Sequence, residues 1–199
     1  MDPIALLKKD HRKVEALFKR FEKTTERASA TRKKIVEEVI RELSVHATIE
    51  EQVLYPFARE ASEDLEDLVL ESLEEHHIVK WTLSELEKMT PDDERFEAKV
   101  TVLMESIRHH VEEEETELFP KLEKALDAEQ LKVLGEQLEA ARRVAPTRPH
   151  PRAPDAPPGN FVAGPVAGLM DRGRDLLKGL TARARKNKGG KRADRQLHS

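Results

Sequence analysis

The chain has 199 residues, of which 37% are charged and 4% aromatic, and it contains no cysteine. This composition favours helices, and the lack of cysteine excludes disulfides, iron–sulfur clusters, thiolate zinc sites and cysteine nucleophiles. The start of the chain has no apolar signal segment and no stretch is long enough to span a membrane, so we expect a cytoplasmic protein.

The net charge of −4 conceals a division of the chain, because residues 1–143 carry −12 and residues 144–199 carry +8. Apolar residues recur with a helical period in the first part and predict four long amphipathic helices and a weaker fifth. The expected ranges are 4–27, 31–61, 64–88, 94–120 and 127–143. Thr31 is the expected N-cap of the second helix, and Pro56 should break or kink that helix near its end.

Long amphipathic helices with short connections predict an all-α fold, an up-down-up-down four-helix bundle with a short fifth helix. We expect residues 1–143 to form this domain. Residues 144–160 are rich in proline and predict an extended linker. Residues 161–199 are basic and interrupted by glycine, which predicts a tail that is weakly helical at first and then disordered.

One thirteen-residue phrase occurs twice, 64 residues apart. Residues 44–56 read SVHATIEEQVLYP and residues 108–120 read RHHVEEEETELFP. Each copy carries a His and a Glu four residues apart, which a helix places on one face. Imidazole and carboxylate together are typical ligands of a transition metal.

Two further histidines extend the repeat backwards. His11 and His76 stand 65 residues apart, each after an acidic residue and at the start of an apolar helical run. The chain therefore reads as a duplicated helix pair. Burying so many ionisable groups without partners costs roughly 2–7 kcal/mol for each polar group, and a metal would satisfy them together. The predicted ligands are His11, His46, Glu50, His76, His110 and Glu114.

This order of His, His-x-x-x-Glu, His and His-x-x-x-Glu, with its trailing LYP and LFP, resembles the hemerythrin-like HHE cation-binding domains over about residues 4–143. The resemblance implies a four-helix bundle that holds an oxo- or hydroxo-bridged non-haem di-iron centre. It implies that His11 and His46 serve one iron, that His76 and His110 serve the other, and that two carboxylates bridge. The bridging residues would be Glu50 and Glu114. Manganese or zinc would accept similar ligands.

The sequence departs from the oxygen carriers of that family at one position. Those proteins have a fifth histidine one turn after the third ligand, where this chain has Lys80. One metal then lacks a protein ligand, which disfavours reversible oxygen carriage. The candidates to fill the gap are a water, a peroxide, or one of four side chains. These side chains are Tyr55, Glu51, Glu115 and Glu113.

The other histidines are expected to lie outside the metal site. His77 and His109 each neighbour a better-aligned histidine, and His150 and His198 fall in the predicted linker and tail. A ferritin-like site would need repeated Glu-x-x-His motifs. The only such spacing near the centre is Glu74–His77, so that alternative is weak.

The resemblance implies a di-iron protein that handles O₂, peroxide or NO, with catalase-like disproportionation of peroxide as one reaction and a role in oxidative stress. The alternative is a non-enzymatic iron or oxygen sensor, or an iron store, that signals through its tail. Clustered Lys and Arg in that tail suit nucleic acid or an anionic surface. The sequence leaves open whether the chain is an enzyme, its electron donor and its oligomeric state.

Overall fold

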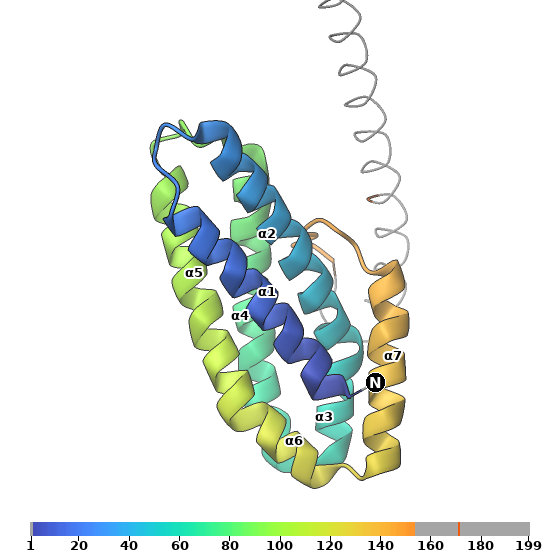
Figure 1. Ribbon diagram of the computed structural model, residues 1–199. Coiled ribbons are helices and arrows are strands. Elements are labelled where there is room, and N and C mark those ends of the chain that lie inside the picture. The colour runs from blue at the N-terminus through green and yellow to red at the C-terminus, as the bar shows by residue number, and fades with distance from the viewer. Residues whose placement is uncertain (1, 154–170, 172–199) are drawn as a thin grey trace, which may run out of the picture.

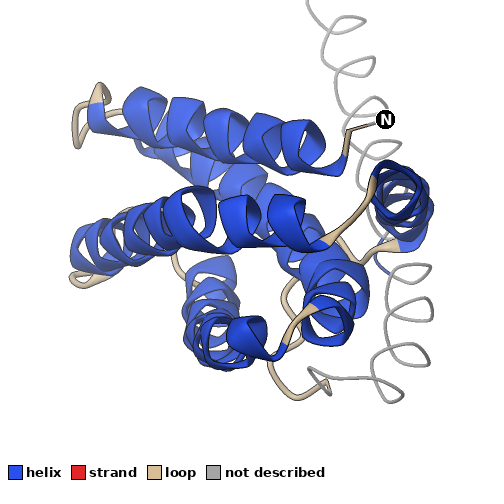
Figure 2. Cartoon of the chain, turned by 90° about the horizontal axis from the view of Figure 1, so that it is seen from below, coloured by secondary structure: helices blue, strands red, loops and turns tan. Residues whose placement is uncertain are grey.

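A computed structural model describes residues 2–153 and 171. The predicted tail, apart from Asp171, and the second half of the predicted linker lie outside these residues. All regular structure in the described part is helical (Figure 2). Its elements are α1 (Pro3–Glu22), α2 (Ser29–Ile49), η1 (Glu50–Leu54), α3 (Tyr55–Ala61), η2 (Glu63–Leu65), α4 (Glu66–Lys88), α5 (Phe96–Glu113), η3 (Glu114–Leu118), α6 (Phe119–Ala125) and α7 (Ala128–Val144).

These elements form the predicted bundle. Its four members are α1, α2 with its continuation into α3, α4, and α5 with its continuation into α6 (Figure 1). The fifth helix, α7, packs beside this bundle against α1, α2 and η1. A capping box starts α7, because the side chain of Asp127 accepts from Gln130 N while the side chain of Gln130 accepts from Asp127 N. The predicted fold is thus confirmed.

Several helix ends differ from the prediction. The first helix ends at Glu22, where the Thr24 hydroxyl donates to the Phe21 carbonyl at 2.6 Å. The predicted cap at Thr31 is wrong, because α2 begins at Ser29 and its N-cap, Ala28, offers no side-chain hydrogen bond. Pattern alone is a poor guide to helix ends, since fraying and local hydrogen bonds move them by a residue or two.

The two prolines of the repeat do not break their helices. A π-helical turn precedes each of them, in which Tyr55 N–H bonds the Glu50 carbonyl and Phe119 N–H bonds the Glu114 carbonyl. Proline lacks an N–H and its ring collides with the carbonyl four residues earlier, so a wider turn lets the helix continue. Both π turns begin at the glutamate of the repeated motif.

The apolar core is divided into two clusters along the bundle. One cluster includes Leu7, Leu54 and Phe119 and also receives Leu134 and Leu138 of α7. The other occupies the opposite end of the bundle and includes Phe18, Phe21, Ile35, Leu83, Leu86 and Phe96. The six predicted ligands lie along the helices between these clusters and interrupt the core with a polar layer.

The first residues of the predicted linker pack onto the bundle. Residues 145–153 contain no helix, yet Ala145 and Thr147 are buried and Arg148 pairs with Glu87 of α4. This part of the linker is therefore held in place instead of extending freely. Among the described helices, none combines the length and the apolar character needed to cross a bilayer.

Candidate metal centre

The six predicted ligands come from six different elements and meet in the middle of the bundle. His11 lies on α1, His46 on α2 and Glu50 at the start of η1; His76, His110 and Glu114 hold the matching places on α4, α5 and η3. None of the six is more than 5% exposed. The structure thus brings together all the residues that the repeat singled out.

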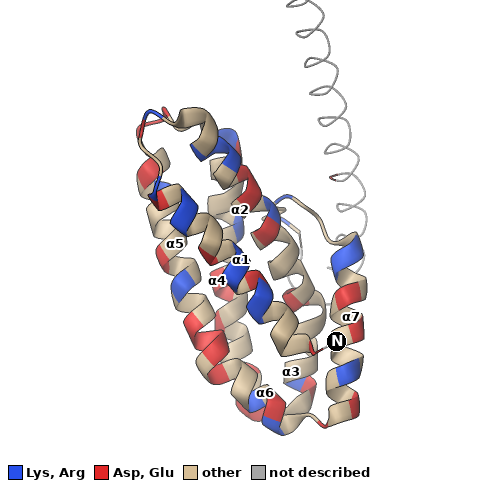
Figure 3. Cartoon of the chain, in the orientation of Figure 1, with Lys and Arg blue, Asp and Glu red and all other residues tan. Residues whose placement is uncertain are grey.

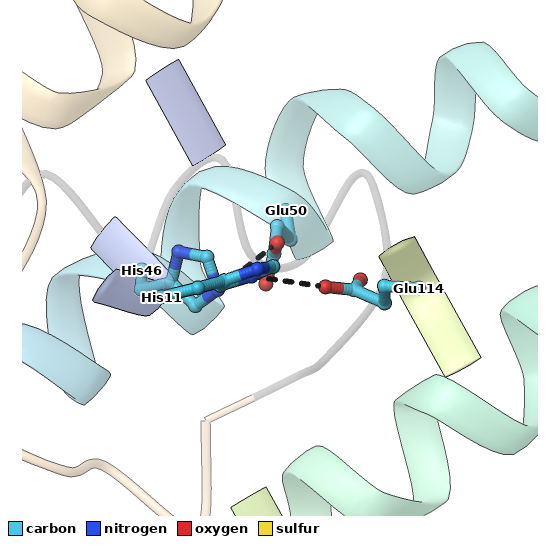
Figure 4. Close-up of side chains that lie close together, drawn as sticks. All are labelled: His11, His46, Glu50 and Glu114. Carbon is cyan, nitrogen blue, oxygen red and sulfur yellow. Dashed lines mark hydrogen bonds and ion pairs between the residues drawn. The ribbon is translucent and has the colours of Figure 1, made fainter. Parts of the chain in front are cut away.

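Four of them form the first cluster, in which the side chains point toward one another (Figure 4). The Nε2 atoms of His11 and His46 lie 3.1 Å apart. The Nε2 atom of His46 lies 3.2 Å from Oε1 of Glu50, and the Nε2 atom of His11 lies 3.3 Å from Oε2 of Glu114.

The second cluster repeats this arrangement with His76, His110 and Glu50. The Nε2 atoms of its two histidines are again 3.1 Å apart. Oε2 of Glu50 lies 3.5 Å from His76 Nε2, and Oε2 of Glu114 lies 3.7 Å from His110 Nε2. Both carboxylates therefore reach both histidine pairs, as bridging ligands must.

These distances fit a metal centre. Two ligands that each sit about 2.1 Å from an ion and subtend a right angle are about 3.0 Å apart, close to the separation of each histidine pair. Both carboxylate oxygens of Glu50 and Oε2 of Glu114 are buried and find no hydrogen bond among the described residues. Leaving such groups unpaired costs several kcal/mol each, and a cation would remove that cost.

A carboxylate lies behind every one of the four histidines. Nδ1 of His11 is 2.8 Å from Glu115, that of His76 is 3.0 Å from Glu51, and that of His110 is 2.6 Å from Glu75. The Nδ1 atom of His46 lies 3.5 Å from Asp10, within ion-pair distance but without a hydrogen bond. Metal-binding histidines almost always direct their other ring nitrogen to such a partner, which fixes the tautomer and the ring orientation.

The carboxylates behind the histidines follow the sequence repeat. Asp10 and Glu75 precede the first His of each half and serve the second His of the same half. Glu51 and Glu115 follow the motif glutamates and serve the first His of the opposite half. Sequence reasoning did not assign this role, although the recurrence of all four residues in register was the signal that could have revealed it.

The pKa values of the two shared carboxylates are shifted in opposite directions. Burial, together with the neighbouring charge of Glu114, raises the pKa of Glu50 well above its ordinary value. Burial opposes ionisation of Glu114 as well, but His110 and His11 lower its pKa below the ordinary value. Two buried carboxylates this close cannot easily both ionise. A bound cation would favour the charged form of both.

The histidines are also tuned by burial. Burial lowers the pKa of His46 to about 4, against the effect of Asp10, and it lowers the pKa of His76. For His110 burial acts in the same direction, but Glu114 and Glu75 outweigh it and raise the pKa. Neutral imidazole is the form that binds a metal. The lowered pKa values of His46 and His76 favour that form.

The four side chains considered as replacements for the fifth histidine lie in different surroundings. Glu51 and Glu115 lie behind His76 and His11, and Glu113 pairs with the exposed His109 at 3.5 Å. The Tyr55 hydroxyl, in contrast, donates to Glu114 Oε1 at 3.1 Å and lies 3.2 Å from His76 Nε2. Of the four, Tyr55 alone places an oxygen among the ligand atoms of the second cluster.

Lys80, the residue at the position of the expected fifth histidine, contacts the carboxylate behind His76. It is buried, and its Nζ donates to Oε2 of Glu51 at 3.0 Å. The other oxygen of that carboxylate contacts His76 Nδ1 at 3.0 Å. Lys80 thus supports His76 through Glu51.

His77 and His109, which the repeat did not select, lie toward the surface. His109 is largely exposed, and His77 is partly exposed and accepts from Trp81 Nε1 at 3.2 Å. His150 contacts Asp171 at 3.1 Å, and His198 falls outside the described residues.

A small cavity of about 20 Å³ adjoins the four ligand histidines. Its remaining walls are apolar and come from four helices. They are Val14, Leu43, Ala47, Val79, Ile107 and Val111. A space of this size holds about one water-sized molecule. It suits a diatomic gas or a peroxide better than an organic substrate.

Comparison with known proteins agrees with this geometry. Residues 2–122 match the family model of the hemerythrin HHE cation-binding domain. The chain is 32% identical over 171 residues to an uncharacterized hemerythrin-like protein of Schizosaccharomyces pombe, covering 85% of this chain and 83% of that one. It is 28% identical over 142 residues to a DNA nickase of a Nostoc species, covering 69% of this chain but 38% of that protein.

A solved structure shares the fold. It is the crystal structure of a hemerythrin HHE cation-binding domain-containing protein from Mycobacterium kansasii, with a TM-score of 0.61 and 23% sequence identity, covering 72% of this chain and 86% of that one. Its likeness concerns the helical bundle, whereas the matching family model and the fission yeast relative concern the sequence itself. The chain belongs to the hemerythrin HHE cation-binding domain family.

Proposed function

We propose that this protein is a non-haem di-iron protein that reacts with O₂, peroxide or NO, and that disproportionation of hydrogen peroxide is its reaction. The observation that carries the proposal is the buried centre of four histidines and two shared carboxylates, with a carboxylate behind every imidazole. Histidine and carboxylate together suit iron, although manganese and zinc accept the same donors. A cytoplasmic location stays a prediction.

In this proposal His11 and His46 would hold one ion, His76 and His110 would hold the other, and both ions would share Glu50 and Glu114. A bound iron pair would supply the redox chemistry of the reaction. The residues around it fix the geometry and exclude bulk water. Asp10, Glu51, Glu75 and Glu115 orient the rings through Nδ1.

The surroundings favour peroxide over oxygen carriage. Lys80 gives the second cluster no ligand nitrogen, whereas Tyr55 places a phenol oxygen there. In disproportionation two peroxides yield two waters and one O₂, so one peroxide is oxidised, the other is reduced, and no outside reductant is needed. The apolar cavity beside the histidines is large enough to admit a molecule of this size.

The test is metal analysis and peroxide turnover of protein loaded anaerobically with Fe²⁺. We expect two irons per chain, a near-ultraviolet oxo-to-iron absorption band after exposure to air, and O₂ release from peroxide. A chain that takes up no iron refutes the metal centre. Two irons without O₂ release refute the disproportionation alone and leave gas sensing or iron storage.

Tyr55 has a matched counterpart for a second test. The equivalent residue in the other half is Phe119, whose ring stacks on His11 at 5.9 Å between centroids. If Tyr55 binds the second iron, the ferric protein shows a visible phenolate-to-iron band that Tyr55→Phe removes. In the double variant Tyr55→Phe with Phe119→Tyr, the band should return on the other iron. Persistence of the visible band in Tyr55→Phe refutes Tyr55 as a ligand.

The basic tail supports a second candidate function, in which the metal state is signalled to nucleic acid. Residues 144–199 carry a charge of +8, and one relative is named a DNA nickase. Gel-shift assays of the full chain and of a chain ending at Ala153, with and without iron, test this. Binding that requires the tail and changes with iron supports a sensor; binding that ignores the metal state removes its mechanism.

A further inference from the structure

A second cluster of metal-binding side chains lies outside the buried centre. Glu75, His109 and Glu113 each offer a ligand atom, and these atoms lie within 4.8 Å of one another. Two carboxylates and an imidazole are donors that Fe²⁺, Mn²⁺, Co²⁺ and Zn²⁺ accept. His109 and Glu113 are one turn apart on α5 and lie 3.5 Å from each other.

This outer cluster is connected to the buried centre through one shared residue. Oε2 of Glu75 lies 2.6 Å from Nδ1 of His110, whose Nε2 faces the centre. Exposure decreases in the same direction, from 63% for the His109 side chain through 33% for Glu113 and 23% for Glu75 to 4% for His110. Ligand groups thus lead continuously from solvent to the buried histidine.

The first half of the repeat lacks this arrangement. The counterparts of His109 and Glu113 are Val45 and the buried Ile49, which bind no metal. The counterpart of Glu75 is Asp10, and Arg142 of α7 forms an ion pair with it, at 2.9 Å from its Nη1 to Oδ1. In the first half of the repeat, which α7 covers, apolar residues and the guanidinium of Arg142 therefore replace the metal-binding side chains.

The charge around the outer cluster also favours cations. The end of α5 and the following η3 carry four consecutive glutamates, residues 112–115, and acidic residues are frequent along this part of the helix (Figure 3). Surface charge of one sign raises the local concentration of counter-ions and their association rates by roughly 10–10³-fold.

We propose that Glu75, His109 and Glu113 form an outer divalent-cation site that captures metal ions and delivers them to the buried centre. The delivery step rests on the di-metal function proposed above, whereas capture of an ion does not. The outer site binds weakly, because its ligands are exposed and few. Its role is therefore kinetic: it speeds loading and leaves the final metal content unchanged.

Loading of the full-length metal-free protein with Co²⁺ tests the delivery step, followed in a stopped-flow instrument by the visible absorption of the buried ions. The variants are His109→Ala and Glu113→Gln, with Glu112→Gln as a control that removes the same charge from the neighbouring position. We expect His109→Ala and Glu113→Gln to load at least about tenfold more slowly, and the control to behave as wild type. Final absorption should be equal in all four proteins.

Equal loading rates overturn the proposal, as does an equal slowing in the control, which would assign the effect to net charge. A reduced final absorption in either variant also overturns it, because the residue would then be part of the buried centre. Wild-type protein without any buried Co²⁺ absorption refutes the di-metal function instead.

Capture is tested separately with Mn²⁺ added to protein preincubated with two equivalents of Zn²⁺. Selective broadening of the NMR signals of the His109 ring by Mn²⁺ supports the outer site. Unchanged His109 signals overturn it.

Discussion

The sharpest expectation concerns His110 and its neighbour His109, which are adjacent in sequence but differ in environment. His110 is buried with its Nε2 in the second cluster, whereas the side chain of His109 is 63% exposed. Substituting His110 by Ala should remove one ion from the centre. Substituting His109 by Ala should leave both ions bound at equilibrium.

The size of the effect follows from linkage between binding and folding. An ion present at a hundred times its dissociation constant stabilises the native state by about 2.7 kcal/mol, so two ions contribute about 5 kcal/mol. For a domain of this size about 1 kcal/mol corresponds to roughly 2–4 °C in melting temperature. We therefore expect metal to raise Tm by about 10–20 °C in wild type and by about half as much in His110→Ala.

The assay is thermal unfolding by circular dichroism, with each protein measured once with metal and once with chelator. Comparing the shift within each protein cancels the packing lost with the imidazole, because that loss is present in both measurements. Metal content of the same samples should be two per chain in wild type and His109→Ala, and one in His110→Ala.

Two results would refute this reasoning. The first is an equal metal-dependent shift in His110→Ala and wild type, which would mean that the buried ring binds no ion. The second is an equally reduced shift in His109→Ala, which would mean that burial and alignment with the repeat do not distinguish ligands from neighbours.

Three further expectations concern the surroundings of the centre. Leu138→Ala opens a cavity where α7 meets the bundle and should lower the free energy of unfolding in denaturant by about 2–5 kcal/mol. The control Val102→Ala, at an exposed position, should change it by less than about 0.5 kcal/mol, and similar losses in both variants would contradict the packing of α7. Glu51→Gln should weaken metal binding by about 10–100-fold in a chelator competition, because His76 loses the charged carboxylate behind its Nδ1. An unchanged affinity would contradict that role. Burial lowers the pKa of His46 from 6.5 to about 4. In protein without metal, the stability that its neutral ring gives is therefore complete above pH 6.5 and is lost as the pH falls through about 4. An equal loss of unfolding free energy in acid for His46→Gln would contradict this.

Much of the site could be predicted because the chain repeats itself. A His and a Glu four residues apart, twice in the same register, already place both side chains on one helical face. The two half-sites must then meet, because amphipathic helices bury the stripes that carry them. Burial of all six residues in one polar layer agrees with that reasoning.

Other features depended on contacts that periodicity does not contain. The cap expected at Thr31 was wrong, since the residue at which α2 begins depends on the local path of the chain after α1. Glu51 and Glu115 were considered as replacements for the missing ligand, but they lie behind histidines of the opposite half. Their role depends on how α1 packs against α5 and α4 against α2, which no local pattern specifies.

The sequence by itself determined the bundle, the six buried residues and the position of Lys80, because helical spacing and repetition act along one chain. The tertiary structure alone decided which of the four candidate side chains lies beside the second cluster, and which half of the repeat α7 covers. Tyr55, Glu51, Glu113 and Glu115 are all candidates in the sequence, yet only Tyr55 places an oxygen among the ligand atoms. The physical reason is that coordination depends on distances between atoms of different helices, and packing of the whole bundle sets those distances.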